Sequence, residues 1–458
     1  MALFCLWLAI LLLSPPKHTC SDALQTMRQW EHSEISVAGF EGAISMWQTG
    51  TEHKDTVILV HGLGQNGSTD WRNVIPVLSS RYRVIAFDLP GFGCSKNVRG
   101  DFTPRAYARV IRHVVATLAT GKVALVGHSM GAAVALRYGA DYPGTLSQLV
   151  LVDAAGILVR TAYVKEVADI PLDTQTGSQW WRRSKAFIEE LSTALIEWVN
   201  LAPDPVDIVR SIRNHLSESH LDASQAAVAL ELLDEDFSKI VPKVALPTHI
   251  IWGADDPVAP LRTAKVLHRR ITGSTLDIIE DAGHVPMASH PTEFNALLLE
   301  RLGGSVQAQK PASVTGTSKG DLRCVNEVGS HYSGRYDTIT LQNCKAVTFE
   351  NVTATQVTMR DSSAAFENLT VRNASVAFDA VHSVVLMTNT QLRGDVALRS
   401  EGSRIDMAGT TLKAATCTLE VRGKSRLIAS LSNLASSSRS RSLHGDFRIR
   451  HSECFDEQ

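Results

Sequence analysis

A serine lies between two glycines in Gly127-His128-Ser129-Met130-Gly131. An apolar run at 123–126 precedes this pentapeptide and an Ala-rich run at 132–136 follows it, which predicts a strand, a tight turn and a helix. Glycine on both sides of Ser129 lets such a turn close without a steric clash. The turn would expose the Ser129 hydroxyl at the carboxyl end of a sheet, where it could act as a nucleophile.

A serine nucleophile needs a base, and the base needs a group that orients it. His284 follows the last predicted sheet strand, and a neutral imidazole there could take the serine proton and return it to a leaving group near pH 7. Two carboxylates, Asp255 and Asp256, follow the preceding predicted strand, and either could orient His284. The chain order Ser, Asp, His is the one expected for this sheet topology.

A developing oxyanion would need N–H donors that are already in place. One donor should be the amide of Met130, the residue after the proposed nucleophile. We expect the second to be the amide of Leu63, in the loop after the first core strand. Gly62 and Gly64 flank Leu63 and would let the backbone approach a substrate closely.

Five further side chains are candidates for substrate contact. His61 and His128 are loop residues beside the predicted site, and each could either stabilise the loop or touch the substrate. Trp180, Trp181 and Trp198 lie in a helical segment, where they could form a helical core or line a substrate wall.

Alternating strands and helices must position these residues. Buried strands are predicted at 56–60, 82–87, 123–126, 148–152, 249–252 and 276–279, after a hairpin at 35–47 and with helices at 104–120 and 291–302 between or after them. This alternation is typical of an α/β fold with a mostly parallel sheet and helices on both faces. Helical periodicity dominates 156–241, which predicts an all-helical insertion.

Five motifs occur in one order along the chain: HGLG (61–64), DLPGFGCS (88–95), GHSMG (127–131), GADDPVAP (253–260) and DAGHVPM (281–287). Over residues 35–302, the chain therefore resembles the α/β-hydrolase superfamily, a fold whose members often carry a helical cap. The resemblance implies an enzyme that uses no cofactor and no metal. The chain departs from many relatives at Cys94, where they carry a polar or basic residue, and Asp88 is expected to serve as a turn residue.

The resemblance also separates the two aspartates. In related enzymes the acid lies three residues after the glycine and four before a proline, and Asp256 alone meets both conditions, between Gly253 and Pro260. Serine at position 129 argues against relatives of haloalkane dehalogenases and epoxide hydrolases, which carry aspartate there.

The expected function is hydrolysis of a carboxylic ester or related acyl bond through an acyl-enzyme. An apolar cap favours a small or lipid-like substrate with an apolar group, as in an esterase or a lipase. Three alternatives remain: a C–C bond hydrolase of the same superfamily, an inactive hydrolase fold retained for binding, and an adhesion protein that acts through its C-terminal part. Lys and Arg total 45 against 47 Asp and Glu, so no basic excess indicates a nucleic-acid partner.

The C-terminal third differs in composition and in its pattern of apolar residues. Residues 303–320 are rich in Gly, Ser, Thr and Gln and predict a linker. Short β-branched runs then recur through 321–432, and Phe-Glu-Asn-Val-Thr at 349–353 returns as Phe-Glu-Asn-Leu-Thr at 366–370. The compact repeat favours a β-solenoid over a sandwich. No paired carboxylates stand there at an obvious catalytic spacing, so we expect this part to be non-catalytic and to make peripheral membrane or glycan contacts. We expect 433–458 to be a partly flexible tail, most of all at 433–442.

The N-terminus and the cysteines bear on localisation. The nearly uninterrupted apolar run 1–13 predicts a signal peptide over 1–23, or else an uncleaved membrane anchor. Four cysteines in the C-terminal third (Cys324, Cys344, Cys417 and Cys454) are expected to form disulfides, with all three pairings open. These features predict a secreted or lumenal protein. Glycosylation sequons begin at Asn66, Asn351, Asn368 and Asn373, and they apply if the host is eukaryotic.

Overall fold

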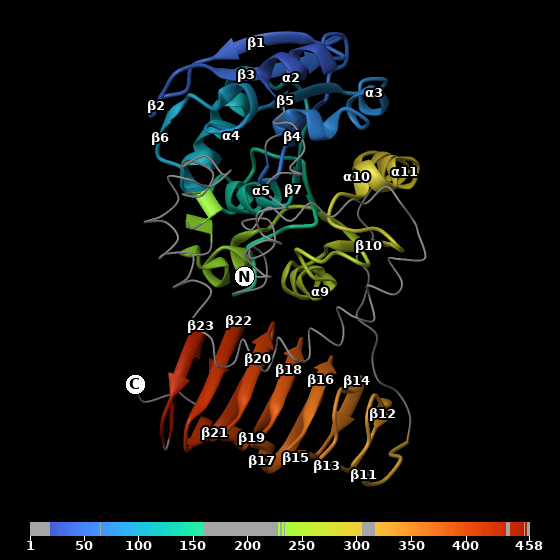
Figure 1. Ribbon diagram of the computed structural model, residues 1–458, viewed down its shortest axis with the longest axis vertical. Coiled ribbons are helices and arrows are strands. Elements are labelled where there is room, and N and C mark those ends of the chain that lie inside the picture. The colour runs from blue at the N-terminus through green and yellow to red at the C-terminus, as the bar shows by residue number, and fades with distance from the viewer. Residues whose placement is uncertain are drawn as a thin grey trace, which may run out of the picture.

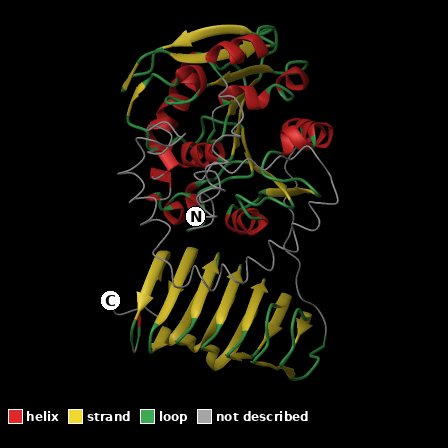
Figure 2. Ribbon diagram, viewed as in Figure 1, coloured by secondary structure: helices red, strands yellow, loops and turns green. Residues whose placement is uncertain are grey.

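The computed structural model describes residues 19–64, 66–159, 228, 229, 231, 232, 234–304, 317–436, 440–452, 454 and 455. They form an α/β part and an all-β part that lie end to end (Figure 1). Helices surround the strands of the first part, whereas the second is built from stacked strands (Figure 2).

The α/β part is built on one eight-stranded sheet. Its order is β1 (Glu31–Ile35), β3 (Ile44–Thr49), β5 (Arg83–Phe87), β4 (Thr56–Val60), β7 (Val123–His128), β8 (Gln148–Val152), β9 (Thr248–Gly253) and β10 (Thr275–Ile279). β1, β3 and β5 pair antiparallel, and all further neighbours pair in parallel. Every residue of β4, β7 and β9 is buried, because helices cover both faces of these apolar strands. The expected α/β class is confirmed.

Helices cover the two faces of the sheet. They are α2 (Cys20–Thr26), α3 (Ile75–Leu78), α4 (Pro104–Thr117), α5 (Met130–Asp141), α9 (Leu261–Arg270), α10 (Pro286–Ser289) and α11 (Pro291–Gly303). Alternate residues of β4 point to opposite faces. Ile58 and Val60 pack with α4, α5 and α9, whereas Val57 and Leu59 pack with α3 and α11. The candidate serine therefore follows a strand that is fixed from both sides.

Most of the predicted helical insertion lies outside the described residues. Trp180, Trp181 and Trp198 are among those positions. The described end of the predicted segment contains the 3-10 turn η4 (Phe237–Lys239), which is followed by η5 (Val241–Lys243).

The all-β part is a two-sided parallel stack. One side pairs β11 (Leu322–Val325), β13 (Thr338–Gln342), β15 (Gln356–Arg360), β17 (Thr370–Val381), β19 (Gln391–Glu401) and β21 (Thr411–Arg422). The other pairs β12 (His331–Arg335), β14 (Val347–Ala354), β16 (Ser363–Glu367), β18 (Val384–Thr388), β20 (Arg404–Ala408) and β22 (Ser425–Ala435). Parallel pairing between alternate strands identifies a β-solenoid rather than an antiparallel sandwich.

The repeated pentapeptides occupy equivalent positions in successive coils. Phe349 and Phe366 are register partners, and their stacked rings lie 4.6 Å apart between centroids. Asn351 and Asn368 both adopt a positive φ, at 53° and 55°, and the Asn368 side-chain amide donates a 3.0 Å hydrogen bond to that of Asn351. The repeat therefore marks both the apolar core and a corner of the solenoid.

Two features of the all-β part differ from what the sequence indicated. The second copy of the repeat, at 366–370, does not lie in one strand, because the chain turns at Asn368, between the end of β16 and the start of β17. The expected flexible segment 433–442 includes the end of β22 and the start of β23 (Ser440–Ile449), which pairs antiparallel with β22. The solenoid thus continues past 432. The sequence suggested a flexible segment there because polar side chains on the outer face of a strand have the same composition as a linker.

Three disulfides link the described cysteines. Cys324 pairs with Cys344 and Cys417 with Cys454, while Cys20 pairs with Cys94. A leader that ended after residue 23 would remove Cys20, so the last pairing is incompatible with that boundary. Disulfides of this kind indicate an oxidising compartment. Among the described residues, no helix has both the length and the apolarity needed to cross a membrane.

The solenoid packs directly on the α/β part. From the first turn of α9, Arg262 donates hydrogen bonds of 2.8 Å to Thr388 Oγ1, 2.9 Å to Asp406 Oδ1 and 2.7 Å to the Met387 carbonyl oxygen. The Val159 amide donates a 2.8 Å hydrogen bond to Ser430 Oγ. Two separate segments of the α/β part therefore hold the edge of the solenoid.

Candidate active site

Ser129 occupies the turn between β7 and α5 with φ 54° and ψ −120°, a backbone conformation that residues other than glycine rarely adopt. A Cβ added at Gly127 would lie 2.4 Å from the Gly131 carbonyl oxygen, and one at Gly131 would lie 2.4 Å from the His61 carbonyl oxygen. Both glycines are therefore required by close backbone contacts on either side of Ser129.

Three predicted side chains form one hydrogen-bonded series. His284 Nε2 lies 2.8 Å from Ser129 Oγ, and His284 Nδ1 lies 2.8 Å from Asp256 Oδ2. The other oxygen of Asp256 accepts hydrogen bonds from the backbone amides of Val258, at 2.7 Å, and Ala259, at 2.9 Å. All three members of the series are buried, with exposed fractions of 1% to 8%. The exposed Asp255 has no part in it.

Asp256 and His284 come from loops at the carboxyl ends of β9 and β10, the same edge of the sheet at which Ser129 follows β7. Strands that pair in parallel end at the same edge, so residues far apart in the chain meet there. In this order the imidazole can take the serine proton, while the carboxylate orients the imidazole and stabilises its charged form.

His128 is buried beside His284. Its Nε2 donates a 2.7 Å hydrogen bond to the backbone carbonyl oxygen of His284. Burial, together with the nearby His284 ring, lowers the pKa of His128 to about 3, so its imidazole is neutral. Its Nδ1 has no hydrogen-bond partner among the described residues. This contact places His128 where it supports the backbone at position 284.

His61 is fully buried and uses both ring nitrogens within the protein. Nδ1 donates a 2.7 Å hydrogen bond to the Gly62 carbonyl oxygen, and Nε2 accepts a 2.9 Å hydrogen bond from the Leu89 amide. A Cβ at Gly62 would lie 2.9 Å from that of Ser129, whereas one at Gly64 would meet no described residue within 4 Å. Thus the backbone at 62 approaches the serine closely, and the backbone at 64 has no such close neighbour among the described residues.

The two predicted amide donors lie on elements beside Ser129. Met130 is the first residue of α5, where amide N–H groups have no acceptor within the helix. Leu63 is partly buried and packs against the core in the loop after β4. Helix N-termini favour negative charge, so the start of α5 suits a developing oxyanion.

Asp88 supports the neighbouring loops, as expected of a turn residue. Its carboxylate accepts hydrogen bonds from the amides of Ser68, at 2.6 Å, and Cys94, at 2.7 Å. Burial raises the pKa of this carboxyl group. Cys94, which departs from the pattern of relatives, thus contributes an amide to Asp88 and a disulfide to Cys20.

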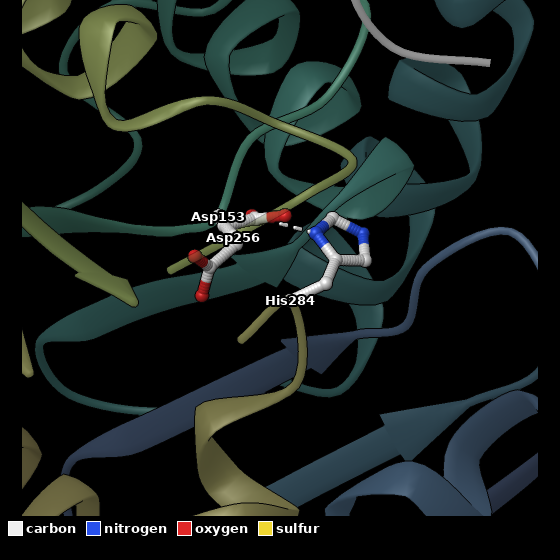
Figure 3. A group of neighbouring side chains, drawn as sticks. All are labelled: Asp153, Asp256 and His284. Carbon is white, nitrogen blue, oxygen red and sulfur yellow. Dashed lines mark hydrogen bonds and ion pairs between the residues drawn. The ribbon is translucent and has the colours of Figure 1, made fainter. Parts of the chain in front are cut away.

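One acidic residue beside the series was not predicted. Asp153 directly follows β8, is fully buried, and accepts a 2.9 Å hydrogen bond from the Gly253 amide. Figure 3 shows its carboxyl group beside that of Asp256, with the ring of His284 on the far side of Asp256. The available sequence signal was an aspartate at the end of a buried strand. A long insertion separates Asp153 from Asp256 in the sequence, so nothing local indicated that the two carboxyl groups meet.

By distance alone, Asp153, Asp256 and His284 could hold a cation, because one donor atom from each lies within 4.8 Å of the others. Both ring nitrogens of His284 already have partners in Ser129 and Asp256. The arrangement therefore suits proton transfer between Ser129 and His284 better than metal coordination.

Known proteins resemble the chain over this same part. The model of the alpha/beta hydrolase family matches residues 57–297. An uncharacterized protein of Mycobacterium bovis is 29% identical over 307 residues, which cover 60% of this chain and 87% of that protein. The 2-hydroxy-6-oxononadienedioate/2-hydroxy-6-oxononatrienedioate hydrolase of Escherichia coli is 30% identical over 262 residues, covering 54% of this chain and 87% of the relative.

Solved structures also align with this part of the chain. An esterase from Exiguobacterium antarcticum aligns with a TM-score of 0.42 and 21% identity, covering 60% of this chain and all of the esterase. The family match spans more than half of the chain, from β4 into α11. The chain belongs to the alpha/beta hydrolase family.

Proposed function

We propose that the protein is a serine hydrolase that cleaves a carboxylic ester, or a related acyl bond, through an acyl-enzyme. The observation that carries this proposal is the pair of 2.8 Å contacts that link Ser129 to His284 and His284 to Asp256. Family membership supports hydrolysis in general, and the buried, preorganised series supports a serine nucleophile in particular.

In the proposed mechanism, Ser129 Oγ attacks the carbonyl carbon while His284 Nε2 takes its proton. Asp256 accepts from Nδ1–H and stabilises the imidazolium that forms. The amides of Met130 and Leu63 donate to the oxyanion of the tetrahedral intermediate. His284 then returns the proton to the leaving alkoxide, and a water molecule, activated by the same imidazole, hydrolyses the acyl-enzyme.

The proposed substrate is small or lipid-like and carries an apolar group. This preference rests on the apolar helical segment of the sequence, including Trp180 and Trp181, which lies outside the described residues. His61 and His128 are weaker candidates for substrate contact, because their donor nitrogens bind the backbone oxygens of Gly62 and His284. Gly62 and Gly64 remain candidates for close backbone approach to the substrate.

A C–C bond hydrolase of the same family is the second candidate. It is favoured by the 30% identity to the E. coli relative, whose name describes a hydrolase of hydroxy-oxo dienedioates. Ser129, His284 and Asp256 would also catalyse that reaction, so the two candidates are distinguished by which substrate the protein cleaves.

We further propose that the protein is secreted or lumenal, as three disulfides favour an oxidising compartment. If a leader is cleaved, the cut falls before Cys20, and retention as an N-terminal anchor is the alternative. Membrane or glycan contact through the solenoid stays a prediction, as does glycosylation.

The test is hydrolysis of p-nitrophenyl esters of increasing acyl length by the full chain, beside a hydroxy-oxo dienoate substrate. Ester hydrolysis that Ser129→Ala abolishes is expected, with Ser80→Ala as the matched control because Ser80 is exposed at the end of α3. Cleavage of the dienoate alone would favour the second candidate. A folded chain that cleaves neither substrate, or a Ser129→Ala variant that keeps its rate, would contradict the proposal.

A further inference from the structure

We propose that Asp153 is a neutral carboxylic acid that donates a hydrogen bond to the Asp256 carboxylate and thereby positions the acid of the site. The inference deepens the proposed function and rests on it, because Asp256 matters to catalysis only if His284 acts as the base. Asp153 is a positioning residue in this account, since it acts on the imidazole through Asp256.

The fold brings the two carboxyl groups together. β8 and β9 are parallel neighbours in which Val152 is the register partner of Ile251. The Asp153 amide continues this pairing with a 3.2 Å hydrogen bond to the Ile251 carbonyl oxygen. With φ at 44°, the backbone then turns, and Asp153 Oδ1 receives the Gly253 amide at 2.9 Å. Asp153 is thus held beside the loop that carries Asp256 (Figure 3).

The hydrogen-bond partners show which carboxyl group holds the proton. Asp256 faces three N–H groups, two from the backbone and one from His284, and these stabilise a negative charge. Asp153 faces one N–H group on Oδ1, and its buried Oδ2 has no N–H or O–H donor among the described residues. A proton on Oδ2 turns this unpaired acceptor into a donor toward Asp256.

Electrostatics favour the same assignment. Asp153 is fully buried and the side chain of Asp256 has no exposed surface, so two adjacent ionised carboxylates would repel each other where water cannot screen them. Burial raises the pKa of Asp153 well above its usual value, and the neighbouring Asp256 charge and a hydrogen bond between the two side chains raise it further. The pair therefore carries one negative charge and one proton.

This arrangement has two consequences for the imidazole. The donated hydrogen bond restrains the Asp256 side chain, so Oδ2 stays aligned with His284 Nδ1. It also draws part of the carboxylate charge away from His284, which limits how strongly the imidazolium is stabilised. Removing the donor should therefore shift the acidic limb of the pH profile to higher pH.

The main experiment compares Asp153→Asn with Asp153→Ala in the full chain. An asparagine amide keeps one acceptor for the Gly253 amide and one donor for Asp256, whereas alanine keeps neither. We expect Asp153→Ala to lose about 10- to 100-fold in kcat, with its acidic limb moved to higher pH, because outer hydrogen-bond partners have effects of this size. Asp153→Asn should rescue the rate to within about 3-fold and leave the acidic limb in place.

Three results of these experiments would overturn the inference. If Asp153 were ionised, Asp153→Asn would remove a charge near the imidazole and move the acidic limb down by about one pH unit or more. If Asp153→Ala matched the wild type in both rate and pH profile, Asp153 would have no positioning role. If EDTA abolished wild-type activity and a divalent cation restored it, the two carboxyl groups would bind a metal ion and would not share a proton.

A second readout does not depend on activity and separates this inference from the proposed function. Infrared difference spectra at pH 7 should contain the C=O stretch of a buried protonated carboxylic acid that Asp153→Asn removes. Asp277→Asn is the matched control, because Asp277 is ion-paired with Arg301 at 2.7 Å and should contribute no such band. Absence of the band from the wild type would refute the neutral acid, even if every ester assay succeeded.

Discussion

The imidazole of His128 donates a 2.7 Å hydrogen bond to the backbone carbonyl oxygen of His284, so the residue before the candidate nucleophile fixes the backbone of the candidate base. The two rings lie 5.0 Å apart between centroids. This link joins the end of β7 to the loop after β10, and it makes the distance between Ser129 and His284 a property of the backbone as well as of side-chain rotamers.

The buried, neutral state of His128 predicts how stability depends on pH. Its pKa is about 3 in the folded protein against an ordinary 6.5, so between these values the unfolded chain binds a proton that the folded chain does not. The free energy of unfolding therefore falls as pH drops below about 6.5, by at most about 1.4 kcal/mol per pH unit from this group.

His128→Gln should make this pH slope shallower, because glutamine can donate to the His284 carbonyl oxygen without titrating. Urea unfolding between pH 7 and pH 4 would measure the slope. The exposed His331→Gln serves as the control. Equal slopes for wild type and His128→Gln would show that His128 does not stay neutral on folding.

Gly131→Ala should slow ester hydrolysis strongly. The added Cβ would lie 2.4 Å from the His61 carbonyl oxygen and 2.5 Å from that of Val60, so either β4 or the turn at Ser129 must move. A displacement of about 1 Å at a reacting group costs on the order of 100-fold in rate. Ester hydrolysis by a folded Gly131→Ala variant measures the loss.

Gly283→Ala is the matched control for that variant, because a Cβ at Gly283 meets no described residue within 4 Å although Gly283 adjoins His284. Equal losses in the two variants would mean that small changes anywhere near the site are damaging, and the specific role of the Gly131 contact would be wrong.

Arg262→Ala should destabilise the whole chain. The Arg262 side chain is 13% exposed and is paired with Asp406 at 2.9 Å, with further hydrogen bonds to Thr388 and Met387. Removing one partner of a largely buried ion pair leaves the other without compensation and typically costs about 3 kcal/mol. Denaturant unfolding followed by tryptophan fluorescence would measure the change.

Lys239→Ala provides the contrast, because the Lys239 side chain is 75% exposed in its pair with Asp236. We expect no measurable change from it. If Arg262→Ala were as stable as Lys239→Ala, the interface between α9 and the solenoid would not contribute to stability.

The Cys20–Cys94 disulfide should be present in the mature, oxidised protein. The bond closes a loop of 74 residues, and in chain-entropy terms such a loop contributes about 4 kcal/mol of stability. The double variant Cys20→Ser with Cys94→Ser should lose much of this in a reversible unfolding experiment. Peptide mapping without reductant should recover the linked peptides. A mature N-terminus beyond residue 20, or a free thiol at Cys94, would contradict the pairing.

Features that depend on short stretches of sequence were predictable. The apolar runs at 56–60 and 148–152 match β4 and β8 residue for residue, since a strand buried on both faces requires a continuous apolar sequence. The GHSMG turn was predictable for a similar reason, because its two glycines are fixed by contacts that no larger residue allows. The solenoid followed from the repeat of Phe349 at Phe366, which stack as neighbouring coils.

Two contacts between distant parts of the chain were not predictable. Asp153 meets Asp256 only because β8 and β9 pair across a long insertion, and nothing local to either residue signals this. Cys20 meets Cys94 for a comparable reason, since α2 packs against η2 (Gly93–Ser95). The choice between Asp255 and Asp256 needed the resemblance. The two aspartates are adjacent and chemically identical, and the sequence does not show which side chain points toward His284.

Covalent labelling with a fluorophosphonate tests the central claim most directly, because the reagent reacts with a serine only when a base activates it. Peptide mass spectrometry of the labelled full chain should find one adduct per molecule, on Ser129, with labelling absent in Ser129→Ala and much slower in His284→Ala. A folded wild-type protein that takes up no label, or an adduct that persists in Ser129→Ala, would contradict the account.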